Sequence, residues 1–456
     1  MSEPSIADVL RLLRDNEQEA GRTFSMVPSE NAMSGLAKLP MMLDAYHRYF
    51  FNETEDPQSW RFRGGQRLAK LETQLAGPLL RQMTGAAHAT LRPLSGLSAM
   101  TLVLAALGGP HGSTVLTIAP ENGGHYATPS IAARLGLNVR FLRGPDPHEL
   151  DYEQVAALVA EAAPTLVYVD QSHCLFPIDV AALVAAVRST GRPTLVHVDV
   201  SHWLGLVLGG VFPNPLRCGA DSFGGSTHKT FPGPQKAVFT TNRQDLADRV
   251  LEAQDYLISS HHFAATISLG LALKEFRDFG GDRYARAVVD NTHRFGARAA
   301  ELGLTLAAAD RGYSAGHQLW IDIEADGVPA MDAGARLYEA GLRVNAIPDL
   351  PGFQGWALRV GLNEPTWRGL AGQEIDELAE IFVLAVHDRA SAESLRARVA
   401  KLRRGCRDRT GYGTPVEPGS PLFRQALALC AAGLLDLPDG EAAALDLSER
   451  LAAELV

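Results

Sequence analysis

Cysteine is scarce in this sequence, and long uncharged apolar runs are missing from it. The 456 residues include four cysteines, Cys174, Cys218, Cys406 and Cys430. They are too few for a disulfide-framed secreted fold and too far apart for a zinc knuckle, and we expect no metal site. No run of about 18 apolar residues occurs and the first residues carry several acids, so we expect neither a membrane-spanning helix nor a signal peptide. These absences predict reduced thiols and a cytoplasmic location.

Concentrated positive charge is missing as well. The sequence has 42 basic and 52 acidic residues, a formal net charge of −10, and neither sign gathers into a block. Binding to nucleic acid or to an anionic membrane needs clustered positive charge, so we expect neither as a partner. Apolar residues make up 46% of the chain and charged residues 21%, which is typical of a globular protein with at least one full core.

The order of apolar runs predicts an α/β fold. Between residues 95 and 242, short β-branched or apolar runs are separated by Ala/Leu-rich helical stretches. The runs are Thr114 to Ile118, Val139 to Leu142, Thr165 to Val169, Thr194 to Val198 and Ala237 to Thr241. This alternation is typical of a doubly wound, mostly parallel sheet, in which ligands bind beyond the carboxyl ends of the strands.

Composition and periodicity divide the chain into four parts. Residues 1–25 form an amphipathic helical arm, whose apolar stripe favours packing on a partner subunit. Residues 26–280 form a large domain, and residues 281–405 form a smaller α/β domain hinged near Gly280-Gly281. Residues 406–456 add a Gly/Pro-rich stretch and two further helical patterns.

Two residues carry the first chemical signal. Lys229, in Ser226-Thr227-His228-Lys229-Thr230, follows a strand-like run. Burial there would lower the pKa of the amine and make it a nucleophile for a Schiff base with an aldehyde cofactor, although a solvated loop lysine fits the pentapeptide equally well. Asp199 closes another apolar run, where an acid can keep a pyridine nitrogen protonated or can simply cap a helix.

Five motifs occur in an order and spacing that resemble the serine hydroxymethyltransferase family of pyridoxal-phosphate (PLP) enzymes of fold type I. They are Ser29-Glu30-Asn31, Gly123-Gly124-His125, Asp199-Val200-Ser201-His202, Thr227-His228-Lys229-Thr230 and Arg359-Val360-Gly361. The resemblance extends from about residue 8 to residue 390. It implies a large doubly wound sheet domain with a smaller C-terminal α/β domain, pyridoxal 5′-phosphate as the cofactor, and a homodimer with active sites at the subunit interface.

The resemblance also implies which residues bind the cofactor. Lys229 would form the Schiff base, Asp199 would pair with the pyridine nitrogen, and His125 would stack on the ring. His202 would lie near the phenolic oxygen. The remaining cofactor candidates are Ser95 and Gly96 in a phosphate-binding turn, Ser98 in place of a hydroxyl usually next to that glycine, Ser226, and Ser259 and Ser260, which replace a glycine-rich loop that reaches a neighbour's phosphate.

The resemblance implies substrate-binding and proton-transfer residues in the same way. Arg359 would bind the substrate carboxylate, since a guanidinium offers a planar bidentate fork. Glu53 would exchange the proton of the β-hydroxyl, with His228 as a second candidate and His125 beside the reacting group. Glu53 can alternatively be an exposed loop acid, because its segment is longer than in the family. The other substrate-binding candidates are Ser29, Glu30, Arg63, Ser172 and Asn345.

Several residues depart from the folate-using members of that family. Phe51 and Phe62-Arg63 stand where tyrosines are expected, and Gln235 stands for an arginine. We therefore expect Cα–Cβ bond chemistry on a β-hydroxy-α-amino acid through a glycyl carbanion that is joined to an aldehyde other than a folate adduct, as in L-threonine transaldolases. Three alternatives stay open: a tetrahydrofolate-dependent serine/glycine hydroxymethyltransferase, other PLP chemistry at the α-carbon (racemisation, decarboxylation or transamination), and a catalytically silent binding subunit.

Overall fold

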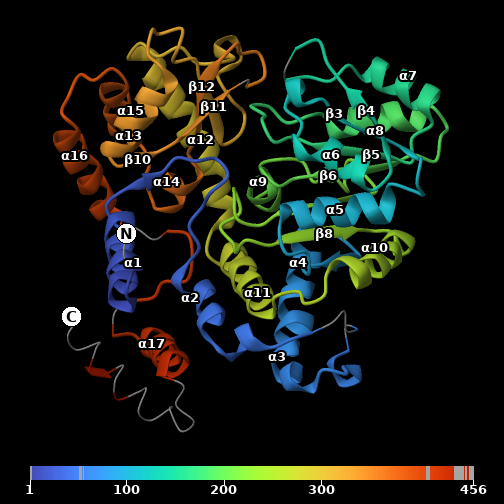
Figure 1. Ribbon diagram of the computed structural model, residues 1–456, viewed down its shortest axis with the longest axis horizontal. Coiled ribbons are helices and arrows are strands. Elements are labelled where there is room, and N and C mark those ends of the chain that lie inside the picture. The colour runs from blue at the N-terminus through green and yellow to red at the C-terminus, as the bar shows by residue number, and fades with distance from the viewer. Residues whose placement is uncertain are drawn as a thin grey trace. The chain divides into compact units, whose positions relative to one another are not determined.

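The computed structural model describes residues 3–50, 54, 56–146, 148–348, 350–406, 411–417, 419–435, 446 and 449–450 (Figure 1). The chain forms two compact units. The smaller unit comprises Met1–Asn31, Cys174–Pro177 and Arg286–Gly411, and the larger unit comprises Ala32–His173, Ile178–Ala285 and Tyr412–Val456.

A seven-stranded sheet lies at the centre of the larger unit. Its strands, in spatial order, are β2 (His88–Thr90), β8 (Ala237–Thr241), β7 (Ser222–Ser226), β6 (Leu195–Asp199), β5 (Leu166–Asp170), β3 (Thr114–Ile118) and β4 (Asn138–Leu142). The strands from β7 to β4 are parallel, while β8 is antiparallel to both of its neighbours. Each of the five predicted runs is a strand, with bounds shifted by at most one residue.

Helices cover this sheet because their apolar residues recur at helical spacing. Buried side chains of α5 and α10 join those of β3, β5, β6 and β8 in one core, and Figure 1 shows both helices beside the sheet. The α-helices of the larger unit are α2 (Gly35–Lys38), α3 (Gln66–Leu71), α4 (Gly77–Thr84), α5 (Gly96–Leu107), α6 (Ala127–Arg134), α7 (Tyr152–Ala162), α8 (Val180–Ser189), α9 (Leu204–Leu208), α10 (Gln244–Leu257), α11 (Phe263–Asp278) and α17 (Pro421–Leu435). The 3-10 helix η1 (Leu39–Met42) and the π-helical segment η5 (Glu72–Ala76) belong to the same unit.

The smaller unit has an antiparallel sheet of its own. Its strands β11 (Asn345–Pro348), β12 (Trp356–Gly361) and β9 (Gln318–Ile321) lie in that order, and β1 (Phe24–Ser25) pairs in parallel with β10 (Leu342–Arg343). Side chains from these strands and from the helices pack into a second core. The helices are α1 (Ile6–Ala20), α13 (Ala330–Glu339), α14 (Asn363–Trp367), α15 (Gln373–Val386) and α16 (Ala392–Gly405), while α12 (Gly281–Glu301) begins in the larger unit and continues into the smaller one.

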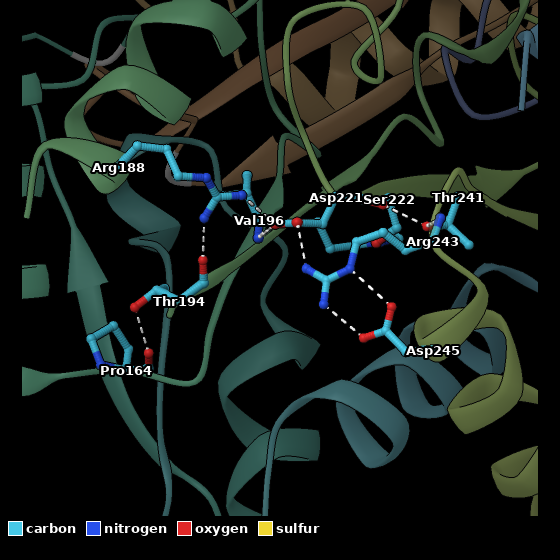
Figure 2. A network of polar contacts seen from close by, with 10 residues as sticks. Pro164, Arg188, Thr194, Val196, Asp221, Ser222, Thr241, Arg243 and Asp245 are labelled. Carbon is cyan, nitrogen blue, oxygen red and sulfur yellow. Dashed lines mark hydrogen bonds and ion pairs between the residues drawn. The ribbon is translucent and has the colours of Figure 1, made fainter. Parts of the chain in front are cut away.

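A charged network fixes the amino ends of the central strands, at the sheet edge opposite the one where ligands are expected (Figure 2). Asp221 accepts hydrogen bonds from Val196 N, Arg188 Nη2 and Arg243 Nη1 at 2.8, 2.6 and 3.0 Å. Arg243 also pairs with Asp245. Because both Asp221 oxygens have partners, the starts of β6, β7 and α10 are held in register.

The division of the chain differs from the one expected at three boundaries. The central segment of the larger unit ends at Ala285 instead of residue 280, because the first turn of α12 packs with it. The N-terminal segment through Asn31 belongs to the smaller unit, where β1 pairs with β10. Residues 412–456 group with the larger unit, and α17 contacts η1. The second C-terminal helical pattern lies mostly outside the described residues.

The sequence predicts no disulfide, no metal site and no membrane-spanning helix. None of the four cysteines forms a disulfide. Within the described ranges, no cluster of His, Cys, Asp or Glu is arranged to hold a metal ion. No helix in the described part of the chain has the length and apolar character needed to cross a bilayer.

Candidate active site

A cavity of about 290 Å³ in the larger unit contains the carboxyl ends of β5, β6 and β7. Its volume is near the lower end of the range for small-molecule sites, roughly 300 Å³ upward. Most of the residues that the sequence predicts for the cofactor line it: Ser95, Gly96, His125, Asp199, His202, Ser226 and Lys229. The wall also contains Ser172, predicted for the substrate, and His228, predicted for proton transfer, together with Asp170 and Gln235. Lys229 and Asp199, thirty positions apart in the chain, therefore share one compartment.

Asp199 is held by two donors and keeps room for a third. The Tyr168 hydroxyl donates to Oδ2 at 2.9 Å, and the Ser201 backbone N–H donates to Oδ1 at 2.8 Å. Burial, followed by the charge of Asp199, raises the pKa of Tyr168 well above its usual range, so the phenol remains a donor. A carboxylate has about four acceptor positions, and Asp199 can therefore accept a further N–H from a ring nitrogen.

A second acid, Asp170, stands beside Asp199 and was missed by the sequence analysis. It ends β5 at the register position paired with Asp199, and its carboxyl accepts hydrogen bonds from the hydroxyls of Thr117, at 3.2 Å, and Thr128. Burial, aided by the charge of Asp199, raises the pKa of Asp170 well above its usual range. The signal was available, because Asp170 closes an apolar run just as Asp199 does.

The turn that carries Lys229 is fixed by its neighbours. Thr227 donates its N–H to Lys236 O at 3.0 Å and its hydroxyl to Pro234 O at 2.6 Å. Burial, and then the charge of Lys229, lower the pKa of His228 to about 4. Nδ1 of His228 is buried and has no hydrogen-bond partner among the described residues. His228 is therefore a neutral imidazole at physiological pH.

The predicted phosphate turn is a capped helix start. Ser95 is the N-cap of α5, and its hydroxyl accepts from Ser98 N at 3.2 Å. Ser98 turns its own hydroxyl back to accept from Leu94 N at 3.2 Å and does not line the cavity. The backbone N–H groups of this helix start, with Ser95 and Gly96 at the cavity wall, are suited to an anion.

The residues present fit PLP. Gly225 has φ of +139°, and a Cβ there would lie 2.8 Å from Asp199 Oδ1. At Gly96, a Cβ would collide with the Ser226 hydroxyl. Glycine at both positions leaves space around the acid and the helix start, while Lys229 offers an amine and Asp199 an acceptor. An aldehyde-bearing, phosphorylated pyridine needs an amine for its aldehyde, an acceptor for its ring nitrogen, a helix start for its phosphate and space beside the acid for its ring.

Comparison with known families decides the relationship. The family model described as serine hydroxymethyltransferase matches residues 3–382. The chain belongs to the serine hydroxymethyltransferase family.

Its relatives within that family include transaldolases. An L-threonine:uridine-5′-aldehyde transaldolase from a Streptomyces species is 45% identical over 83% of this chain and 89% of the relative. A serine hydroxymethyltransferase from Methanopyrus kandleri is 31% identical over 90% of this chain and 96% of the relative. The solved structure of an L-threonine transaldolase from Pseudomonas fluorescens, in its internal aldimine state, matches with a TM-score of 0.78 and 25% identity over 89% of this chain and 91% of that one.

Membership in the serine hydroxymethyltransferase family confirms the predicted fold, enzyme class and cofactor. The protein is a PLP-dependent transferase of fold type I, with the predicted large sheet domain and smaller α/β domain. The transaldolase relatives support the predicted aldol-type chemistry with an aldehyde acceptor. The individual roles of the site residues stay predictions.

Several predicted substrate-binding residues of this family member belong to the smaller unit. Arg359, on β12, is 5% exposed, donates from Nε to Gln318 Oε1 at 2.8 Å, and is the register partner of Asn345. Burial lowers the pKa of Arg359 to about 10, which still leaves the guanidinium charged at neutral pH. The exposed Glu30 accepts from the Ser25 hydroxyl at 2.7 Å, and Ser29 is half-buried beside it.

The remaining residues that were predicted for the site do not line the cavity or lie outside the residues that the structure describes. Arg63 is exposed and donates to Gln58 O at 3.1 Å. Ser259 is exposed and its hydroxyl shares a 2.8 Å hydrogen bond with the Tyr49 hydroxyl, while Ser260 is half-buried; neither lines the cavity of its own chain. Glu53, with Phe51, lies outside the described residues, so its predicted role has no structural account.

Proposed function

We propose that this enzyme cleaves L-threonine and joins its glycyl unit to a nucleoside 5′-aldehyde. The identity to the relatives supports this choice, since it is 45% with the uridine-5′-aldehyde transaldolase and 31% with the serine hydroxymethyltransferase. Gln235 at the cavity wall, where the folate-using enzymes have an arginine, is consistent with a different acceptor.

The overall reaction exchanges one aldehyde for another. The Cα–Cβ bond of threonine breaks and acetaldehyde leaves, after which the same α-carbon bonds to the carbonyl carbon of the acceptor. The proton lost from the threonine hydroxyl is balanced by the proton gained on the new hydroxyl, so no oxidant or reductant is needed. PLP, when bound, supplies the electron sink that weakens the bonds of the α-carbon.

Side chains of this chain bind, orient and move protons around that centre. Lys229 provides the attaching amine, and Asp199, fixed by Tyr168 and Ser201, accepts the hydrogen bond of the ring nitrogen. The neutral His228 is suited to hold the hydroxyl proton of the amino acid. Arg359 is proposed to bind the carboxylate through its guanidinium.

We also propose that the enzyme is a cytoplasmic homodimer with shared active sites. None of the residues of α1 is buried, and Ile6, Leu10 and Leu12 are 81, 61 and 64% exposed, which suits the predicted arm on a partner subunit. The exposed Ser259 is available to a neighbouring chain. Four cysteines outside any disulfide fit a reducing compartment.

The test supplies purified enzyme with L-threonine and uridine-5′-aldehyde. Acetaldehyde release and the mass of the β-hydroxy-α-amino acid product are measured, with Lys229→Ala as the inactive control. We expect acetaldehyde only when an acceptor aldehyde and intact Lys229 are present. Turnover of serine that depends on tetrahydrofolate, with no nucleoside product, would instead identify the hydroxymethyltransferase.

A further inference from the structure

A buried ionic cluster of the larger unit contains Lys236, which follows the cavity residue Gln235 in the chain. Lys236 is fully buried, and its Nζ donates to His261 O at 2.7 Å and more weakly to Arg92 O at 3.5 Å. Glu72 accepts from Arg92 Nε at Oε1 and pairs with His261 Nε2 at Oε2, both at 2.9 Å. The four residues come from distant parts of the chain, and each is at most 6% exposed.

The cluster joins three segments that the family resemblance assigns to cofactor binding, the third of them to the cofactor of a neighbouring chain. Backbone groups of Lys236 bond to Thr227 N and Oγ1, at 3.0 and 3.2 Å, in the turn that carries Lys229. Arg92 leads into the turn of Ser95 and Gly96, and Ala237 N donates to Pro93 O in the same segment at 3.2 Å. His261 directly follows Ser259 and Ser260 and precedes His262, whose φ is +52°.

Burying the charged amine of Lys236 costs folding free energy, so stability of the fold does not by itself explain this residue. Burial lowers the pKa of Lys236 to about 7, the charge of Glu72 opposes this shift, and that of Arg92 adds to it. Burial also lowers the pKa of His261 and of the neighbouring His262, so both are neutral near pH 7. Burial alone would raise the pKa of Glu72, but the charge of Arg92 and the hydrogen bonds from Arg92 and His261 outweigh it and lower that pKa. An apolar side chain of similar length would avoid the cost of burying this amine.

We propose that Lys236 is a positioning residue for the PLP site, whose side-chain amine holds the Arg92 and His261 carbonyls so that the lysine turn, the phosphate turn and the Ser259–Ser260 loop keep their spacing. This inference rests on the proposed function, because these segments matter together only if they hold PLP: the lysine turn and the phosphate turn in the cavity of this chain, and the Ser259–Ser260 loop in that of the neighbouring chain. Lys236 touches neither substrate nor cofactor in this arrangement and acts through the two carbonyls.

The test compares Lys236→Met with Lys401→Met, which changes an exposed lysine on α16. Two quantities are measured: the rate at which holoenzyme loses PLP after dilution, and the thermal midpoint of the full chain after the cofactor is removed. Loss of charge-assisted hydrogen bonds predicts PLP release about tenfold faster for Lys236→Met. Its thermal midpoint should fall only slightly, because removal of the buried charge offsets the loss of a donor to two carbonyls, and Lys401→Met should change neither quantity.

The pH dependence of PLP release distinguishes a positioning role of Lys236 from a general contribution to stability. Release from the wild type should accelerate as pH rises through about 7, where Lys236 loses its charge, while Lys236→Met should lack that step. Glu72→Gln removes the charge that raises the pKa of Lys236, so the step should move to lower pH; this variant also carries the test if Lys236→Met does not fold.

Three results would overturn the inference. Lys236→Met could release PLP at the wild-type rate, or release it faster with an equivalent loss of thermal stability. In Glu72→Gln, the pH at which PLP release accelerates could stay the same as in the wild type. A wild-type enzyme that binds no PLP would defeat the proposed function together with this inference. Normal PLP binding with an indifferent Lys236 would defeat this inference alone.

Discussion

Asp170 and Asp199 are register partners at the ends of the adjacent parallel strands β5 and β6. Both line the same cavity, yet their environments differ. Asp199 accepts from a phenol and a backbone N–H, whereas Asp170 accepts from two threonine hydroxyls. Because two neighbouring carboxyls resist ionising together, the pair divides into an acid suited to a ring cation and an acid that keeps its proton.

Asp170→Asn should therefore preserve folding at neutral pH. The raised pKa means that folded Asp170 binds a proton that the unfolded chain has lost, so wild-type stability should fall as pH rises from about 4 through the raised pKa. An amide has no such titration. Urea unfolding across that range should show a flatter profile for Asp170→Asn, and a profile identical to that of the wild type would contradict the assignment.

Tyr168→Phe should weaken PLP binding without abolishing it. The variant loses one of the two donors that orient Asp199, which predicts about tenfold faster PLP release. Asp199→Asn removes the charged acceptor itself and should raise release on the order of 100-fold. Absorbance of bound PLP during dilution measures both rates. Equal effects of the two changes would argue that Asp199 does not pair with the ring.

Gly225→Ala should damage the site more than the fold. A Cβ at Gly225 would approach Asp199, and its φ of +139° suits glycine. Gly112 is a matched control, since its φ is +89° but a Cβ there would meet open space. Backbone strain should cost both variants about 1–3 kcal/mol of unfolding free energy, and Gly225→Ala should cost more because its Cβ would also lie 2.5 Å from Ser201 N. Only Gly225→Ala should also lose PLP; retention of the cofactor by both variants would contradict the geometry.

Arg359→Lys should raise the KM for the amino acid while leaving PLP release unchanged. A lysine keeps the positive charge but cannot form the planar bidentate contact with a carboxylate. We expect KM to rise roughly 10- to 100-fold, as for loss of a hydrogen bond to a charged group. Steady-state kinetics with threonine provides the measurement. An unchanged KM would mean that the substrate carboxylate binds elsewhere.

The strand pattern could be predicted because it is a local signal, whereas most of the cavity residues were predicted from the family resemblance and only two from local patterns. Asp199 and Lys229 each follow a run of apolar residues, and parallel strands bring such ends to one edge. Asp170 carried the same local signal and was overlooked. Ser98 was assigned to phosphate, but its hydroxyl bonds to Leu94 N, a local backbone competition typical of serine near a helix start.

The buried cluster could not be predicted from local patterns. Glu72 and His261 are 189 positions apart, and nothing near either residue indicates the other. The end of the larger unit, likewise, depends on how the first turn of α12 packs, which its helical periodicity does not determine. Such long-range contacts form only in the folded chain and leave no local pattern in the sequence.

The central claim is the covalent bond between Lys229 and PLP. Borohydride reduction of the holoenzyme followed by peptide mass spectrometry tests it most directly. We predict that reduced PLP is found on the peptide that contains Lys229, and that Lys229→Ala carries no label. A label on the buried Lys236 or another lysine, or none on the wild type, would contradict the account.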